Sequence, residues 1–480
     1  MSPCGSNTLT NFRSMAARAA LFASSSLLAP GVAFANGRYP LSQQVLVDPS
    51  DMQHLYLRST YGVLTSSNAG AAWSWLCEPG IGYDPGEDPM MAILGDGSVL
   101  AGASEGLFTT RDRGCSWPKD GYIGARYVND LAAERDGVTV LAATVTVLAS
   151  GRYEAQLWRS TDAAMTWSNL GDLAAGSLLP FTLDAAPSDP QRIYVTGASL
   201  PAARDGGVSS GSGVLLGSTD GGATFAELPI PGTDRNNPPL IAAIDPSNPD
   251  VLYVRVQGAW DMTNPVESWL LYSKDAGKTW KELFRAKADM LGFALSPDGG
   301  TVLVGMGDTR DVLRPVDTTV LGLYRADPTS LSFSRMSNGQ VGCLMYSGSA
   351  LYVCGSQETD GYELGLSNDD GATVSPLFEY GTVKGPLACP ASTPQAMICG
   401  PQWPYSCAGL GSCPHVDAGT STSPNGGSGG GCCGSATSKT KQSQVGTAQL
   451  DMLPDVNGVW LAATALLAGA LRRLTRRRSP

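Results

Sequence analysis

One short signature recurs along the chain at fairly even intervals, and this repeat limits the folds that the sequence can adopt. It reads Ser/Thr-x-Asp-x-Gly-x-Thr-Trp, with small variations, and begins at Ser66, Thr110, Ser160, Ser218, Ser273 and Ser367. The starts lie 44, 50, 58, 55 and 94 residues apart. A repeat of about this period builds stacked supersecondary units, so the sequence predicts a repeat architecture.

The last interval is close to twice the others and predicts a degenerate copy inside it. The stretch YRADPTSLSF at 324–333 fits, because it keeps Asp327, a hydroxyl residue and a closing aromatic residue while it loses the glycine. We therefore count seven units. The residues expected to build the signature turns are Asn68, Gly70, Trp73, Asp112, Gly114, Trp117, Asp162, Trp167, Asp220, Gly222, Phe225, Asp275, Gly277, Trp280, Asp327, Asp369 and Gly371.

Each signature is expected at the turn of a β-hairpin. Its Asp can accept hydrogen bonds from amides of its own turn, its Gly tolerates positive φ, and its aromatic residue enters the next strand as an apolar anchor. A second strand-turn-strand pattern precedes nearly every signature, as in VLVDPSDMQHLYL from Val45. Two hairpins per unit mean four strands per unit.

Seven four-stranded units with Gly- and Pro-rich turns predict an all-β fold. The favoured architecture is a seven-bladed β-propeller of antiparallel blades at 36–417, in which radial closure protects the strand edges. An open β-solenoid is the alternative, but it needs shorter coils.

The signature resembles the Asp box, or BNR repeat, of sialidases, of the sortilin-type ectodomain and of the photosystem II assembly propeller. The resemblance spans about residues 60–380. It implies a propeller and leaves the function open, because Asp-box propellers serve hydrolysis, receptor binding and assembly.

Both ends of the chain predict export. Residues 1–35 form a predicted signal peptide, in which Met15 fits the start better than Met1 and Ala33-Phe34-Ala35 is the cleavage site. A Gly/Ser-rich linker follows the propeller at 418–455 and contains Cys432 and Cys433. Residues 456–480 combine a short apolar, transmembrane-like helix with an Arg-rich end.

This end of the chain resembles the MYXO-CTERM sorting tail of surface proteins. The resemblance implies processing near Cys432 and Cys433 and retention at the outer surface. A plain C-terminal membrane anchor is the alternative. Both interpretations attach the propeller to a membrane or cell surface, outside the cytoplasm.

Eight further cysteines in the body suggest disulfides. Cys343 with Cys354 and Cys389 with Cys399 each flank a predicted hairpin, and Cys407 and Cys413 are close in sequence. By elimination, Cys77 is expected to pair with Cys115. Zinc is the competing use of cysteine, but no CxxC pair occurs and the two histidines, His54 and His415, are isolated. We expect no metal and no other cofactor.

Charge limits the partners. The formal net charge is −11, and the leader and tail contribute seven arginines, so the remainder carries about −18. Nucleic acid is therefore excluded as an expected partner, while proteins and glycans remain. We expect a monomeric propeller.

Long loops on one face mark the expected binding surface. If the strands of each unit are named A to D, the A–B turns and the signatures share one face and the B–C loops occupy the other. The B–C loops are long in units three to six, and such insertions usually mark a binding face, although drifted solvated loops are the alternative. The candidate ligand-binding residues are Arg152, Tyr153, Arg204, Trp260, Asp261, Glu267, Arg310, Asp311 and Arg314.

The predicted function is non-catalytic binding of a protein or glycan at the cell surface. A sialidase-like exo-glycosidase is the alternative, and it needs three converging arginines, a Tyr nucleophile activated by Glu, and an acidic residue. The arginine motif that sialidases carry near the N-terminus is absent, so we assign no catalytic residues. A hydrolase should gather arginines and carboxylates with shifted pKa values in the channel, whereas a binding module should spread them around the rim.

Overall fold

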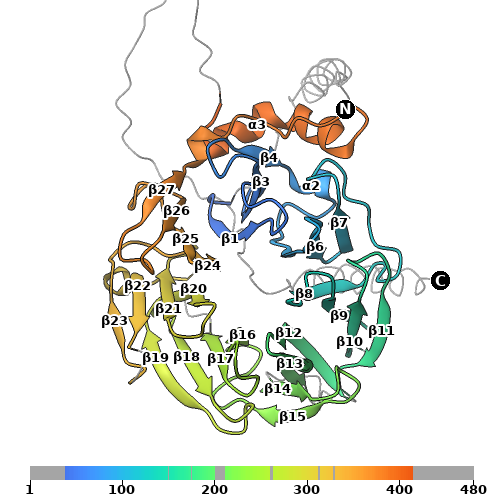
Figure 1. The fold of residues 1–480 in the computed structure, drawn as a ribbon, viewed down its shortest axis with the longest axis vertical. Helices are drawn as coiled ribbons and strands as arrows, with labels where there is room; N and C mark the ends of the chain where they lie inside the picture. Colours follow the sequence, from blue (N-terminus) through green and yellow to red (C-terminus); the bar gives the residue numbers. More distant parts are fainter. Residues whose placement is uncertain are drawn as a thin grey trace, which may run out of the picture.

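The structure is a computed structural model that describes residues 38–413, except residues 150, 175, 201–210, 260–262, 312–313 and 328–329. Seven antiparallel sheets stand radially around a central channel, which confirms the predicted seven-bladed propeller (Figure 1). In each sheet, strands that are consecutive in sequence are neighbours in space, from strand A at the channel outward. Each blade is one continuous stretch of chain.

The strands of blades 1 to 4 are β1 (Ser42–Val47), β2 (Leu55–Ser59), β3 (Gly62–Ser66), β4 (Ser74–Leu76); β5 (Met90–Ile93), β6 (Val99–Ala103), β7 (Gly106–Thr110); β8 (Tyr127–Ala133), β9 (Val140–Val147), β10 (Tyr153–Ser160), β11 (Ser168–Asp172); β12 (Ser177–Ala186), β13 (Asp189–Leu200), β14 (Ser212–Ser218) and β15 (Ala226–Pro229). Those of blades 5 to 7 are β16 (Pro239–Ile244), β17 (Leu252–Gln257), β18 (Ser268–Ser273), β19 (Lys281–Ala286); β20 (Asp289–Leu295), β21 (Val302–Gly307), β22 (Gly322–Ala326), β23 (Phe333–Arg335); β24 (Cys343–Ser347), β25 (Ala350–Cys354), β26 (Leu364–Ser367) and β27 (Ser375–Phe378). Short helices are α2 (Glu78–Ile81), the 3-10 helices η1 (Thr318–Val320) and η2 (Tyr380–Thr382), the π-helix η3 (Gln395–Cys399), and α3 (Gly400–Leu410).

Blade 2 departs from the predicted four strands and has three. A single bridge between Phe108 and Lys119 stands where the fourth strand would lie. Pro118 accepts a hydrogen bond from the Thr109 N–H at 3.2 Å but has no N–H of its own to donate. The segment after Trp117 therefore follows β7 without extending the ladder.

The signature turns lie between strands C and D and repeat one set of hydrogen bonds. In blade 5, the Ser273 hydroxyl donates to Asp275 at 2.8 Å and accepts from the Gly277 N–H at 2.9 Å. The Thr279 N–H and hydroxyl donate to the same carboxylate at 2.9 and 2.6 Å. The turns of blades 3, 4 and 7 make the same four bonds. In the degenerate turn of blade 6, Asp327 accepts from the N–H and hydroxyl of Ser330 instead.

The signature glycine also packs the turn against the preceding blade. Gly277 has φ of +82°, and a Cβ built there would lie 2.3 Å from Cδ2 of Leu215 in blade 4. Gly371 stands in the same relation to Leu323 in blade 6, at 2.2 Å. Blade 3 places Ala164 at this position, with φ of +60°. The signature therefore fixes a turn and a blade interface together.

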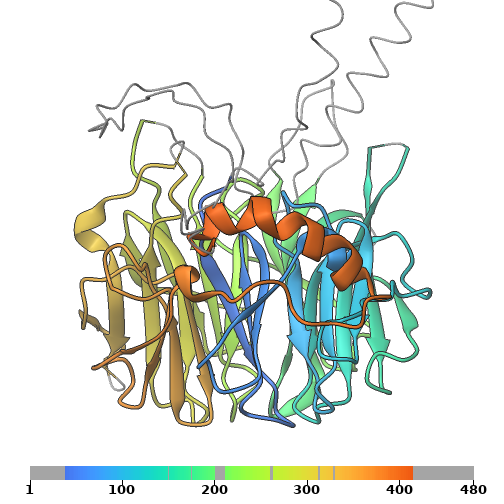
Figure 2. The ribbon, with the colours of Figure 1, turned by 90° about the horizontal axis from the view of Figure 1, so that it is seen from above.

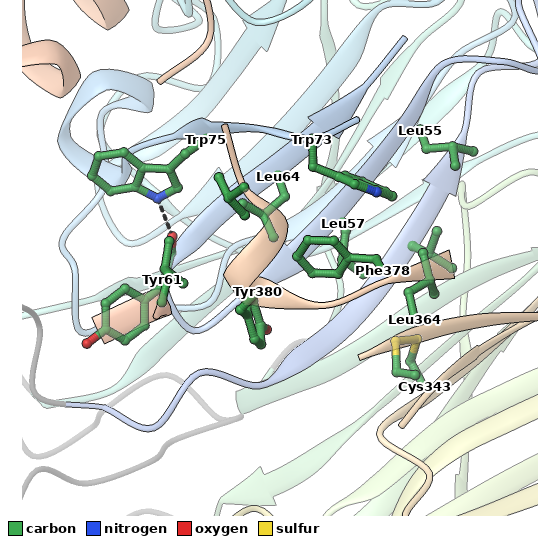
Figure 3. Close-up of a cluster of buried hydrophobic side chains, with 14 of the residues drawn as sticks. Leu55, Leu57, Tyr61, Leu64, Trp73, Trp75, Cys343, Leu364, Phe378 and Tyr380 are labelled. Carbon is green, nitrogen blue, oxygen red and sulfur yellow. Dashed lines mark hydrogen bonds between the residues drawn. A yellow bond between two sulfur atoms is a disulfide. The ribbon is translucent and has the colours of Figure 1, made fainter. Parts of the chain in front are cut away.

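A C-terminal strap, residues 384–413, closes the ring across blade 1. The Trp75 N–H donates to Gly385 O at 2.8 Å, and the Leu387 N–H donates back to Trp75 O at 2.9 Å. Figures 1 and 2 show α3 running along the outer flank of blade 1, beside β4. The seam between blades 1 and 7 buries Trp73, Trp75 and Tyr380, and Trp75 Nε1 donates to Tyr61 O at 2.6 Å (Figure 3).

Two of the four predicted disulfides are wrong. Cys343–Cys354 and Cys407–Cys413 are bonded as predicted, but Cys77 pairs with Cys399 and Cys115 with Cys389. The prediction assumed a hairpin between Cys389 and Cys399, whereas residues 395–399 form a π-helix. The strap crosses blades 1 and 2. Cys399 therefore bonds to Cys77, 322 residues away in sequence, and Cys389 bonds to Cys115, 274 residues away.

The predicted signal peptide, the linker with Cys432 and Cys433, and the Arg-rich tail lie outside the described residues. Within the described part of the chain, no helix has the length and apolarity needed to cross a membrane.

Candidate ligand-binding face and channel

The two faces of the propeller are built as the strand order predicts. The A–B turns touch the signature turns, since the Ala69 N–H donates to Gln53 O at 2.8 Å and the Ala276 N–H to Asp250 O at 2.9 Å. The B–C loops occupy the opposite face, at the top of Figure 2.

Blade 3 presents its two candidate residues at the tip of a long hairpin. Arg152 is exposed, and its carbonyl accepts from the Leu148 N–H at 2.8 Å. Tyr153 is half-buried, and its N–H donates to Ser177 Oγ at 3.1 Å. Arg204, Trp260 and Asp261 lie outside the described residues.

Blade 5 holds Glu267 in an ion-pair group on its outer strands. Arg285 contacts Glu267 at 2.8 Å and Glu282 at 2.6 Å. The same guanidinium lies 4.4 Å from the ring centroid of Trp269. Glu267 is thus partnered on the flank of the blade.

Blade 6 folds its B–C loop inward. Arg314 donates to the fully buried carboxylate of Asp289 at 2.8 Å, and its N–H donates to Asp311 O at 2.9 Å. Asp311 is itself buried. The Val266 N–H of the neighbouring loop donates to Pro315 O at 2.9 Å. Asp311 and Arg314 therefore anchor this loop.

Arg310 belongs to a cluster between blade 6, blade 7 and the first described residues. It has φ of +59°, lies 3.6 Å from Glu358, and its guanidinium lies 5.5 Å from the ring centroid of Tyr39. Burial and a hydrogen bond to Glu358 raise the pKa of Tyr39 to about 12. Burial raises the pKa of nearby Glu363 to about 7. Sequence reasoning did not select Tyr39, because it precedes the first strand.

Charged residues on the two inner strands were also missed. The Arg58 guanidinium donates to Pro89 O at 2.8 Å, in the next blade. Asp130 accepts from the N–H of Leu131 at 2.9 Å and of Leu183, in blade 4, at 2.8 Å. Burial raises the pKa of both Asp130 and Asp184 to about 7. The available signal was a single charge inside an apolar strand, as in LYLRS and LYVRVQ.

Arg255 and Asp130 satisfy backbone groups near bulges in the innermost strands. The register of β20 shifts between Met290 and Gly292, and Arg255 of blade 5 donates to Met290 O at 2.8 Å and Leu291 O at 3.1 Å. The register of β8 likewise shifts beside Asp130. A bulge leaves a residue outside the ladder, and buried backbone groups need partners. The buried charges therefore join neighbouring blades.

A cavity of about 270 Å³ lies in the channel against the inner strands of blades 1, 5, 6 and 7. Its polar side chains are Gln43, Gln44 and Arg255. Burial, and then the charge of Arg58, lower the pKa of Arg255 to about 10. Within the described residues, no group of three or more His, Cys, Asp or Glu side chains is placed to hold a metal.

The predicted rim residues do not gather at one point. Arg314 is bound to Asp289, Arg310 faces Glu358, and Arg152 stands on another blade. The described candidates instead lie on blades 3, 5 and 6.

Comparison with known proteins finds distant sequence similarity. No family model matches it. It is similar to the xyloglucanase Xgh74A of Acetivibrio thermocellus, with 26% identity over 257 residues. That alignment covers 51% of this chain and 25% of the relative, so the chain spans about a quarter of that protein's length.

Solved structures give distant likenesses. The GH74 enzyme of Niastella koreensis aligns with a TM-score of 0.37 and 15% identity over 72% of this chain and 66% of that one. The extracellular domain of the putative hybrid two-component system BT4673 of B. thetaiotaomicron aligns with a TM-score of 0.45 and 12% identity, over 70% and 38%. These likenesses are too distant to bear on function.

Proposed function

We propose that this protein is an exported β-propeller that binds a glycan through its B–C face without hydrolysing it. The proposal rests on the ion pairs that charged side chains of that face make within the protein. Arg310, Arg314 and Glu267 each have a charged protein partner, so they hold loops in place. Glycoside hydrolysis usually needs two carboxyl groups flanking an open site.

Export is supported by the four disulfides, which persist in oxidising compartments. The predicted signal peptide at 1–35 and the tail at 456–480 agree with it. As finer parts of the proposal, the signatures are Asp boxes, and the tail sorts or anchors the protein at the cell surface.

A glycan is preferred over a protein ligand because of the sequence relative. That protein is named a xyloglucanase, and 257 residues of it align with this chain. The B–C face adds exposed Arg152 and half-buried Tyr153, and aromatic and polar side chains of this kind suit sugar recognition.

Glycoside hydrolysis is the second candidate. The same relative favours it, and so does the group formed by Tyr39, Glu358 and Arg310, in which a tyrosine, a carboxylate and a guanidinium meet. One guanidinium is fewer than the three arginines that a sialidase-like site uses.

The test is a glycan array together with a glycosidase screen on the purified full-length chain. Arg152→Ala removes an exposed arginine from the B–C face, and Arg113→Ala, which removes a similarly exposed arginine from the signature face, is the matched control. Glycan binding without turnover, weakened by Arg152→Ala alone, supports the proposal. Turnover that Tyr39→Phe abolishes establishes the hydrolase instead, and binding unaffected by either arginine variant moves the site off this face.

A further inference from the structure

The channel cavity lies where three inner strands are irregular. Its lining includes Gln43, Ala242 and Leu291, each of which falls at a register shift of β1, β16 or β20. Because a bulge displaces the strand locally, these irregularities shape a recess in the channel wall. The recess is part of the inner wall and is separate from the B–C loops.

Arg255 gives this cavity one cationic group with unused donors. Its Nη1 donates to Met290 O and Leu291 O, at 2.8 and 3.1 Å. No hydrogen bond of its Nε or Nη2 is found among the described residues, and Arg255 is half-buried and lines the cavity. No described carboxylate lies within ion-pair distance of the guanidinium. An arginine fork left free in this way suits a bidentate carboxylate.

The surrounding charges leave that guanidinium positive. Arg58 is close enough to lower the pKa of Arg255, while Asp289 and Asp130 act in the opposite direction. Asp289 is already bound by Arg314 at 2.8 Å. The Asp130 carboxylate accepts two backbone N–H groups. Both acids therefore have other partners.

The remaining side chains of the wall are mainly apolar. Leu46, Phe293 and Met345 line the cavity and are half-buried. An apolar cavity of about 150 Å³ is large enough to hold benzene. The volume of about 270 Å³ therefore accommodates a ring or short chain together with a charged group.

We propose that the channel cavity binds a small organic carboxylate with an apolar body, whose carboxylate accepts from the free edge of Arg255 while its body packs on Phe293 and Met345. This site goes beyond the glycan-binding function, because it uses inner-strand residues and none of the B–C loops. Either site can be present without the other.

The experiment is calorimetric titration of the full-length chain with benzoate, with its neutral analogue benzyl alcohol, and with gluconate as a hydroxylated carboxylate. We expect saturable binding of benzoate, at least tenfold tighter than that of either other probe. Arg255→Lys keeps the charge but loses the fork, and should weaken benzoate at least tenfold.

A second variant keeps the test informative if Arg255→Lys misfolds. Ala242→Met fills the cavity and leaves the hydrogen bonds of Arg255 in place, so it should abolish benzoate binding while the melting temperature without ligand stays near that of the wild type. Arg152→Ala, on the B–C face, is the control and should bind benzoate normally.

Three patterns of binding would overturn the proposal. They are equal affinity for benzyl alcohol and benzoate, tighter binding of gluconate than of benzoate, and benzoate binding that survives Ala242→Met. Absence of benzoate binding at millimolar concentration would also reject it. The glycan array tests the B–C face independently, so either proposal can fail without the other.

Discussion

Aspartates in two regions of the propeller have pKa values that are shifted in opposite directions. In the signature turns, hydrogen bonds from the side chain and N–H of a threonine four residues on lower the pKa of Asp162, Asp220 and Asp275 to about 2. On the inner strands, burial raises the pKa of Asp130 and Asp184 to about 7. One residue type thus has a lowered pKa in the signature turns and a raised pKa on the inner strands.

The difference comes from burial on the inner strands and from local side-chain donors in the turns. A signature Asp accepts hydrogen bonds from residues within four positions, whereas Asp130 accepts from the adjacent Leu131 N–H and from the Leu183 N–H, 53 positions away. Local donors stabilise the ionised carboxylate, and loss of water destabilises it. The channel side therefore depends on tertiary packing, and substitutions there should cost most.

The largest effect is expected from Arg314→Met, which leaves the Asp289 carboxylate buried without its cation. Removing one partner of a buried ion pair costs about 3–5 kcal/mol. Urea unfolding measures this loss. The double variant Arg314→Met/Asp289→Leu should recover much of it, and a double variant as unstable as the single one would contradict the assigned pairing.

Gly277→Ala should have the next largest effect. It should lower the free energy of unfolding by about 2 kcal/mol, because it adds positive-φ strain and a close contact with Leu215. Gly348→Ala is the matched control, since Gly348 also has positive φ (+58°) but nothing lies within 4 Å of its added Cβ. Thermal unfolding should show a smaller loss for the control. Equal losses would mean that the glycine serves the turn alone and not the blade interface.

Paired substitutions should separate the two regions by pH. The raised pKa of Asp184 contributes stability below about pH 4 that is lost as pH rises toward 7. Asp184→Asn should therefore match the wild type in stability at pH 4 and be more stable than the wild type at pH 8. The lowered pKa of Asp162 contributes stability above pH 3.8 that is lost as pH falls toward 2. Asp162→Asn should therefore be less stable than the wild type at pH 7 and equal to it in stability near pH 2. Unfolding curves across pH 2–8 test both, and parallel profiles for the two variants would reject the comparison.

The smallest expected effect is a gain in stability. Ala164 occupies the glycine position of the blade 3 signature with φ of +60°, so Ala164→Gly relieves strain at some cost in unfolded-state entropy. We expect a net stabilisation of about 0.5 kcal/mol, visible as a slightly higher melting temperature. A lower melting temperature would show that the Ala164 methyl group contributes more by packing than it costs in strain.

The sequence predicted what local contacts determine. The signature spacing led to seven blades, and Cys343–Cys354 and Cys407–Cys413, which span 11 and 6 residues, were paired correctly. The pairs of Cys77 and Cys115 were wrong because their partners lie 322 and 274 residues away, on a strap that carries no repeat. Arg58 and Arg255 were missed for the same reason, since their partners are backbone carbonyls of the next blade.

The strap determines how the protein carries mechanical load. A pull on the chain beyond Cys413 enters at α3, and Cys399 and Cys389 pass it covalently to Cys77 and Cys115 in the first two blades. The last blade, which precedes the strap, lies outside this covalent path. A propeller held by its C-terminus would therefore bear tension through the Cys77–Cys399 and Cys115–Cys389 disulfides. The seam between blades 1 and 7 would open only after those disulfides were reduced.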